Sequence, residues 1–214
     1  MLTTLEEKVD PRNAALIVVD VQNDFCHSDG SLARNGSDMT AIQAMVPRLE
    51  GFLAEARRIG LPIVFIRTER DDATKSEAWR EQRQRTGRDP TVCDKGTWGA
   101  EFYRVAPEAG EPVITKHRYS AFIGTNLDTT LRSMGVKSIL TCGVATNVCV
   151  ESTARDGAML DYYLVFLSDL SATGSQELHE ATLTNMRNQF GQVVTADEVV
   201  AAWRRVAATV PRSA

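Results

Sequence analysis

The chain has few residues of the kinds that bind metals or form disulfides. Its 214 residues include three histidines and four cysteines, Cys26, Cys93, Cys142 and Cys149, with no CxxC pair among them. Small secreted domains are dense in disulfides, and structural zinc sites need clustered Cys and His ligands. This usage predicts reduced thiols and no zinc site. We therefore expect a cytoplasmic protein.

Long apolar runs and blocks of one charge are also missing. No stretch approaches the roughly eighteen consecutive apolar residues of a membrane-spanning helix, and the N-terminus is acidic where a signal peptide would be basic. The 24 basic and 28 acidic side chains give a formal charge of −4 without a basic cluster. These features argue against a nucleic-acid surface and a membrane anchor, so the expected partner is a small-molecule substrate.

Apolar runs alternate with amphipathic stretches along the whole chain. The runs predict strands over residues 14–20, 61–67, 111–116, 138–142, 163–169 and 192–195. Helical periodicity predicts helices over residues 40–59, 126–134, 176–190 and 197–208, and one more after Gly143. Residues 21–36 are predicted to form a loop, and the charged residues 69–88 a solvated excursion that could be a lid. Such alternation predicts a parallel sheet covered by helices, in a single domain over residues 1–214.

The stretch from Ser138 to Gly157 is the centre of the functional prediction. An apolar strand ends at Gly143, and a helix follows it with Thr146 or Asn147 as the expected N-cap. Cys149 falls in the first turn of that helix, where unpaired N–H groups carry partial positive charge and favour ionisation of a thiol. The alternative is that Cys149 is only a small buried apolar side chain.

Two further ionisable side chains stand where predicted strands end. Asp20 closes the first strand and Lys116 closes the third. Because reactive groups of parallel sheets gather at the carboxyl ends of the strands, we predict that Asp20, Lys116 and Cys149 meet there. A thiolate beside an ammonium, with a carboxylate to move the proton, is a nucleophilic site that needs no histidine. Taken singly, an aspartate cap and a solvated lysine are the alternative interpretations.

These residues resemble a known family, the isochorismatase-like cysteine hydrolases of the N-carbamoylsarcosine and ureidoacrylate amidohydrolase type. Three motifs in chain order carry the resemblance: residues 15–25 (ALIVVDVQNDF), 116–122 (KHRYSAF) and 143–157 (GVATNVCVESTARDG). It implies a Rossmann-like three-layer α/β/α fold with a six-stranded, mainly parallel sheet. It also implies assembly as a homodimer or homotetramer.

The resemblance assigns roles within these motifs. Asp20, Lys116 and Cys149 would form a catalytic triad, and a cis peptide between Val144 and Ala145 would turn backbone N–H groups toward an oxyanion. The implied activity is hydrolysis of a C–N bond in a small amide, ureido or carbamoyl compound, through a thioester, with release of ammonia or an amine. The alternatives are a thiol redox protein and a catalytically silent scaffold of the same fold.

Pocket walls and cofactors complete the set of expectations. We expect Gln22, Phe25 and Tyr119 to bind the substrate, with further walls from Trp79, Trp98 and Phe122 and with core packing as the alternative for each aromatic ring. Nicotinamidases of this family carry an Asp-x-His metal motif after the second strand, whereas residues 66–72 here contain no histidine. We therefore expect no metal and no other cofactor.

Overall fold

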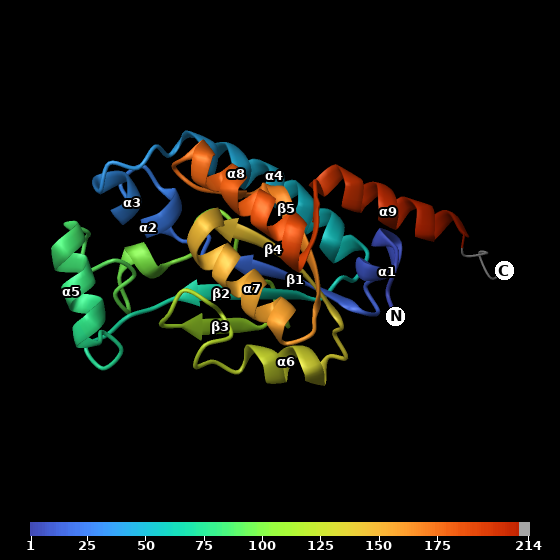
Figure 1. Cartoon of the computed structure of the whole chain (residues 1–214), viewed down its shortest axis with the longest axis horizontal. Coiled ribbons are helices and arrows are strands. Elements are labelled where there is room, and N and C mark those ends of the chain that lie inside the picture. Colours follow the sequence, from blue (N-terminus) through green and yellow to red (C-terminus); the bar gives the residue numbers. More distant parts are fainter. Residues whose placement is uncertain (210–214) are drawn as a thin grey trace.

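A computed structural model describes residues 1–209 and shows a six-stranded sheet with strand order β3-β2-β1-β4-β5-β6 (Figure 1). The strands are β1 (Ala14–Val19), β2 (Ile63–Thr68), β3 (Val113–Lys116), β4 (Ser138–Val144), β5 (Tyr163–Ala172) and β6 (Gly191–Val194). All five neighbouring pairs run parallel, so the predicted α/β sheet is confirmed. Every residue of β1 and β4 is buried, as continuous apolar runs at the centre of a parallel sheet require.

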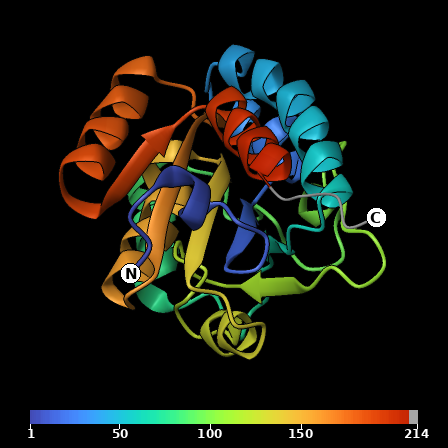
Figure 2. The ribbon, with the colours of Figure 1, turned by 90° about the vertical axis from the view of Figure 1, so that its right-hand side faces the viewer.

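Helices cover both faces of the sheet. The helices are α1 (Leu5–Lys8), α2 (Asn23–Cys26), α3 (Ser31–Arg34), α4 (Thr40–Arg58), α5 (Glu77–Thr86), α6 (Leu127–Ser133), α7 (Glu151–Met159), α8 (Gln176–Asn185) and α9 (Ala196–Thr209). Helices α4 and α9 pack on one face and α6, α7 and α8 on the other, which gives the expected three layers (Figure 2). No helix within residues 1–209 is long and apolar enough to cross a membrane.

The two apolar cores follow from the alternation of side chains along each strand. In β1, Leu16 and Val18 face α4 and α9, whereas Ile17 and Val19 face the opposite layer. Each such fully buried side chain contributes roughly 1.5–3 kcal/mol to folding. Trp203 of α9 belongs to the core between the sheet and α4 and α9, and its indole N–H donates a hydrogen bond to the carbonyl oxygen of Val9 at 2.8 Å.

Two stretches predicted to be irregular contain helices. The predicted loop 21–36 forms α2 and α3, and the charged excursion 69–88 contains α5. Helix α5 begins where the Ser76 hydroxyl accepts from the N–H of Trp79, and it ends at Gly87, whose φ of 63° closes the last turn. These three helices lie beyond the carboxyl ends of β1 and β2 (Figure 1). They therefore cover the edge of the sheet where the functional residues were predicted.

The expected N-cap of the helix after β4 is wrong. A π-helical turn, η2 (Thr146–Val150), precedes α7, and Ala145 is the residue at its N-cap. The Thr146 hydroxyl lies 3.0 Å from Nδ1 of His179 in α8, so it serves a contact between helices instead. A second π turn, η3 (Met186–Phe190), similarly replaces the end of the predicted helix 176–190.

Gly143 is required by the close approach of β4 to β1. Its φ is 120°, a conformation that side-chain-bearing residues rarely adopt, and an added Cβ would overlap the carbonyl oxygen of Val19. Because β1 and β4 are adjacent central strands, neither backbone can move without disturbing both cores. Gly143 thus fixes where β4 delivers the residues that follow it.

Replacing Gly143 with alanine should lower the free energy of unfolding by about 3 kcal/mol or more, since it adds backbone strain to a steric clash. The matched control is Gly51→Ala, at an exposed position of α4 where an added Cβ meets no atom within 4 Å. That change should stabilise the protein by about 0.5–1 kcal/mol through helix propensity. Denaturant unfolding measures both, and equal midpoints for wild type and Gly143→Ala would refute the steric argument.

Candidate active site

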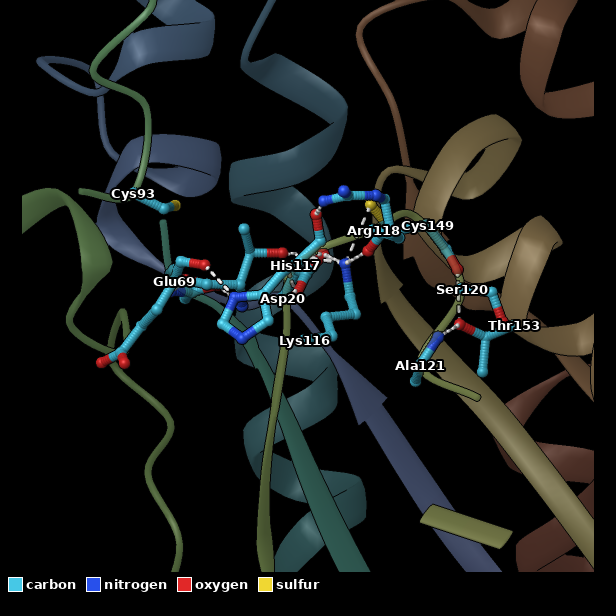
Figure 3. A network of polar contacts seen from close by, with 12 residues as sticks. Asp20, Glu69, Cys93, Lys116, His117, Arg118, Ser120, Ala121, Cys149 and Thr153 are labelled. Carbon is cyan, nitrogen blue, oxygen red and sulfur yellow. Dashed lines mark hydrogen bonds and ion pairs between the residues drawn. The ribbon is translucent and has the colours of Figure 1, made fainter. Parts of the chain in front are cut away.

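The structure brings the three predicted ionisable residues together at the carboxyl edge of the sheet. Asp20 follows β1, Lys116 ends β3, and Cys149 lies in η2 after β4. The Lys116 Nζ atom is 2.7 Å from Asp20 Oδ2 and 3.5 Å from Cys149 Sγ (Figure 3). Asp20 and Lys116 have no exposed surface, and Cys149 is 8 % exposed. The sulfur is therefore the member of this group that a ligand can reach.

The backbone at Asp20 adopts an uncommon conformation. Its φ is 52°, in the left-handed region that costs a residue other than glycine about 1–3 kcal/mol. Its N–H still donates to the carbonyl of Ile66 at 3.0 Å, so the residue remains attached to β2 while its chain turns out of the sheet. Such strained positions concentrate at functional sites, where the surrounding structure holds them.

Thr68 is a member of this site that the sequence analysis did not identify. It ends β2, between β1 and β3, and its register partner in β3 is Lys116. Its hydroxyl donates to the Asp20 carboxylate, at 3.1 and 3.2 Å from the two oxygens, and accepts from Lys116 Nζ at 2.8 Å. The carbonyl oxygen of Arg118 accepts from the same ammonium at 3.0 Å. Lys116 is thus held by polar groups on several sides, as a buried cation requires.

A second contact fixes the turn that carries the cysteine. The Thr153 hydroxyl donates to the carbonyl oxygen of Cys149 at 2.7 Å and accepts from the N–H of Ala121 at 3.0 Å (Figure 3). One buried side chain therefore joins η2 to the loop that follows β3. The sequence motif contains this threonine but gives no indication of its partners.

Burial dominates the ionisation of the thiol. It raises the pKa of Cys149 to about 12, although the charge of Lys116 acts in the opposite direction. Asp20 raises this pKa further through its charge and through a hydrogen bond that favours the protonated thiol. Burial tends to lower the pKa of Lys116, but attraction to Asp20 and Cys149 outweighs it and raises that pKa. The helix terminus is expected to favour ionisation of Cys149, but burial acts in the opposite direction and raises the pKa of this thiol.

A cavity of about 590 Å³ opens beside the sulfur. Cys149, Val144, Ala145, Phe25 and Tyr119 are among its lining residues. The peptide bond between Val144 and Ala145 is cis, the geometry that the family resemblance implies. Phe25 and Tyr119 thus lie where substrate-binding residues were expected.

The other expected pocket residues lie elsewhere. Gln22 is fully buried and joins backbone groups: its amide donates to the carbonyls of Thr68 and Ala100 at 2.9 and 2.7 Å, and its oxygen accepts from the N–H of Thr68 at 2.8 Å. It therefore positions Thr68 and does not line the cavity. Of the aromatic side chains, Trp98 packs edge-on against His27, and the Phe122 ring stacks on Tyr162.

The described residues contain no group of three or more His, Cys, Asp or Glu side chains that could hold a metal ion. The nearest histidine in the chain to the triad, His117, directs its Nδ1 at the carbonyl oxygen of Glu69, 2.7 Å away. The acidic residues after β2 have other partners, since Glu69 pairs with Arg67 at 3.3 Å and Asp72 with Arg80 at 3.1 Å. Both carboxylates are therefore engaged in ion pairs with arginines.

Comparison with known proteins agrees with this geometry. The isochorismatase domain family matches residues 14–198. Ureidoacrylate amidohydrolase RutB of Enterobacter sp. (strain 638) is 37% identical over 199 residues, which cover 86% of this chain and 86% of the relative. The protein of the same name from Stutzerimonas stutzeri (strain A1501) is 36% identical over 197 residues, 86% of this chain and 79% of the relative.

Solved structures of related hydrolases have a similar fold. A cysteine hydrolase from Pseudomonas syringae pv. phaseolicola 1448A superposes with a TM-score of 0.83 at 27% identity, over 92% of this chain and 95% of that one. Nicotinamidase PncA from Bacillus subtilis has a TM-score of 0.72 at 27% identity, over 85% and 99% of the two chains. The chain belongs to the isochorismatase family. It is a hydrolase that acts on carbon–nitrogen bonds other than peptide bonds.

The raised pKa of Cys149 predicts how its alkylation depends on pH. The rate with iodoacetamide should rise about tenfold per pH unit from neutral pH to about pH 10 without reaching a plateau, because the reactive thiolate is a small fraction throughout. Lys116→Met should react more slowly at each pH, since it removes the charge that lowers this pKa. Mass spectrometry of the Cys149 peptide gives the rates, and a melting curve verifies that the variant is folded. A plateau near neutral pH would contradict the raised pKa of Cys149.

Proposed function

We propose that this enzyme hydrolyses the C–N bond of a small amide, ureido or carbamoyl compound through a thioester on Cys149, and that it releases ammonia or an amine. The observation that carries the proposal is the buried contact of Lys116 with both Asp20 and Cys149, 2.7 and 3.5 Å away, beside a cavity large enough for a small molecule. A nucleophile, a proton acceptor and a fixed positive charge are thereby within reach of one bound carbonyl group.

In the first half-reaction the thiol proton moves to Asp20 as the sulfur attacks the carbonyl carbon. Lys116 stabilises the negative charge that develops on the sulfur, which burial otherwise disfavours. The carbonyl π electrons move to oxygen, and the resulting oxyanion would lie near the backbone of Val144 and Ala145, which line the cavity with Cys149. The intermediate then re-forms the carbonyl, the C–N bond breaks, and Asp20 returns the proton to the leaving nitrogen.

In the second half-reaction water replaces the nitrogen. A water molecule attacks the thioester carbon through its oxygen, and Asp20 accepts a proton from that water. The C–S bond breaks, the sulfur regains its proton from Asp20, and the acid product leaves. The sum is one substrate and one water converted into an acid and ammonia or an amine, so no redox step is involved.

The relatives suggest where to look for the substrate and its setting. Because proteins 36–37% identical to this one are named ureidoacrylate amidohydrolases, ureidoacrylate is the first ureido compound to test. We place the enzyme in the cytoplasm, since a catalytic thiol has to stay reduced. A homodimer or homotetramer is likewise our proposal for its assembly.

Cys149→Ser should lower ammonia release by about 10³-fold or more while the melting curve stays close to that of wild type, because a serine hydroxyl is far less ionised and less nucleophilic than a thiol. A panel of primary amides, N-carbamoyl amino acids, biuret and ureidoacrylate serves as substrate. Cys26→Ser and Cys93→Ser, which change buried thiols outside the cavity lining, are the controls and should retain activity.

Other outcomes of that experiment identify the alternative functions. Residual activity of Cys149→Ser within tenfold of wild type would show that Cys149 is not the nucleophile. A tenfold loss corresponds to about 1.4 kcal/mol of activation free energy, which is too little for replacement of the attacking atom. A thiol redox protein would release no ammonia but would react at Cys149, and a silent scaffold would do neither.

Hydrolysis should need no added metal. We expect prolonged dialysis against EDTA to leave ammonia release unchanged, because the Asp20 carboxylate is already bonded to Lys116 and Thr68 and the thiol supplies the first nucleophile. Activity that disappears on dialysis and returns with Zn²⁺, Mn²⁺ or Fe²⁺ would show that a metal takes part.

A further inference from the structure

The cavity beside Cys149 has a strongly one-sided charge. Four arginines line it, Arg34, Arg70, Arg83 and Arg88, and no aspartate or glutamate is among its lining residues in the described part of the chain. The whole chain has the opposite balance, with 28 acidic and 24 basic side chains. The positive charge is therefore a local property of this cavity.

Two of these arginines differ from the others in burial and in partners. Arg34 pairs with Asp89 at 2.7 Å, and Arg88 is exposed to solvent. Arg70 and Arg83 are 4 % and 9 % exposed, and neither has a carboxylate within 4.0 Å among the described residues. The Nε atoms of both are buried without a hydrogen-bond partner. Arg70 does donate from one terminal nitrogen to the carbonyl oxygen of Val92 at 3.2 Å. Both arginines are nevertheless buried cations with an unsatisfied Nε donor and no carboxylate partner within the described chain.

The ring of Trp79 contacts both guanidinium groups. Their Cζ atoms lie 5.3 Å and 5.2 Å from the centre of its ring, and Lys75 Nζ lies 5.9 Å from the same centre. A cation–π contact contributes roughly 0.5–2 kcal/mol, whereas removing an ion from water costs several kcal/mol. Burial accordingly lowers the pKa of Arg83, and repulsion from Arg70 adds to the effect. An anion brought in from solution would offset both costs.

We propose that Arg70 and Arg83 bind a carboxylate of the substrate while its C–N bond faces Cys149. The substrate class is then a small carboxylic acid that bears an amide, ureido or carbamoyl group, a refinement that rests on the function proposed above. A guanidinium group is planar and matches the two oxygens of a carboxylate with two parallel N–H donors, whereas a neutral amide offers one acceptor oxygen and no charge. Tyr119 lines the same cavity as Cys149 and Arg83, and its hydroxyl is 3.4 Å from Gln82 of α5, so it contacts the helix that carries Arg83.

Two alkylating agents that differ only in charge test the proposal without any need for turnover. Iodoacetate carries a carboxylate and iodoacetamide is neutral, and both react with the same thiolate of Cys149. The ratio of their rate constants at one pH therefore cancels any change in thiol ionisation. We expect Arg83→Gln and Arg70→Gln each to lower the iodoacetate-to-iodoacetamide ratio at Cys149 by about tenfold, the effect of losing one charge-assisted contact.

The matched control is Arg80→Gln, on the same helix and with the same loss of charge. Arg80 pairs with Asp72 at the surface and is not among the cavity-lining residues, so the ratio should stay at the wild-type value. A comparison within wild type needs no variant: the ratio at Cys149 in the folded protein should exceed that of the same cysteine in urea. An equal ratio in folded and unfolded protein, or an unchanged ratio in both arginine variants, would overturn the proposal.

A substrate pair connects this subsite to catalysis. Succinamate and succinamide share a primary amide and differ in the carboxylate, so Arg83→Gln should raise KM for succinamate by about tenfold, with kcat and the values for succinamide little changed. The two proposals fail separately. Absence of ammonia from every compound would refute the hydrolysis and leave the alkylation ratio meaningful, whereas ammonia release with no dependence on Arg70 and Arg83 would refute the anion subsite alone.

Discussion

The ion pair between Asp20 and Lys116 is the constraint around which the site is built. Both groups are fully buried, and removing one partner of such a pair leaves an uncompensated charge that costs roughly 3–5 kcal/mol. The pair connects the ends of β1 and β3, which are not neighbours in the sheet, and Thr68 of the intervening β2 bonds to both side chains. The strand order thus places Lys116, Thr68, Asp20 and Cys149 in sequence along one edge of the sheet, and the path of the proton follows from the topology.

The parts of this arrangement that sequence predicts are those set by local pattern. Continuous apolar runs predict the central strands. The carboxyl ends of parallel strands lie at one edge of the sheet, so the sequence alone predicts that Asp20 and Lys116 are close together. Thr68 could not be predicted in this way, because its role depends on the register between β2 and β3, and one polar residue at a strand end has many uses. Gln22 belongs to the same motif as Asp20, but only the tertiary structure shows that its side-chain amide bonds to backbone groups of Thr68 and Ala100.

The burial of ionisable side chains is the property that the sequence predicts least well. A charged stretch with one tryptophan predicts a solvated surface, because composition carries no information about which arginines are buried. In the structure Arg83 of α5 is buried and lines the cavity. The thiol shows the same limit. Its position near a helix terminus favours ionisation, but the energetic cost of burying charge is larger, so the protonation state depends on surroundings that the sequence does not display.

The hydroxyl of Thr153 has a consequence for how such an enzyme can change its specificity over evolution. It bonds to the carbonyl of Cys149 and to the N–H of Ala121, so the nucleophile and the loop carrying Tyr119 form one mechanical unit. A substitution that reshapes this wall of the cavity would therefore displace the sulfur as well. Within residues 1–209 no side chain of α5 forms a hydrogen bond or ion pair with Asp20, Lys116 or Cys149, so the side chains of α5 can be exchanged while the catalytic distances stay as they are. New substrate preferences in this scaffold are expected to arise on α5 first.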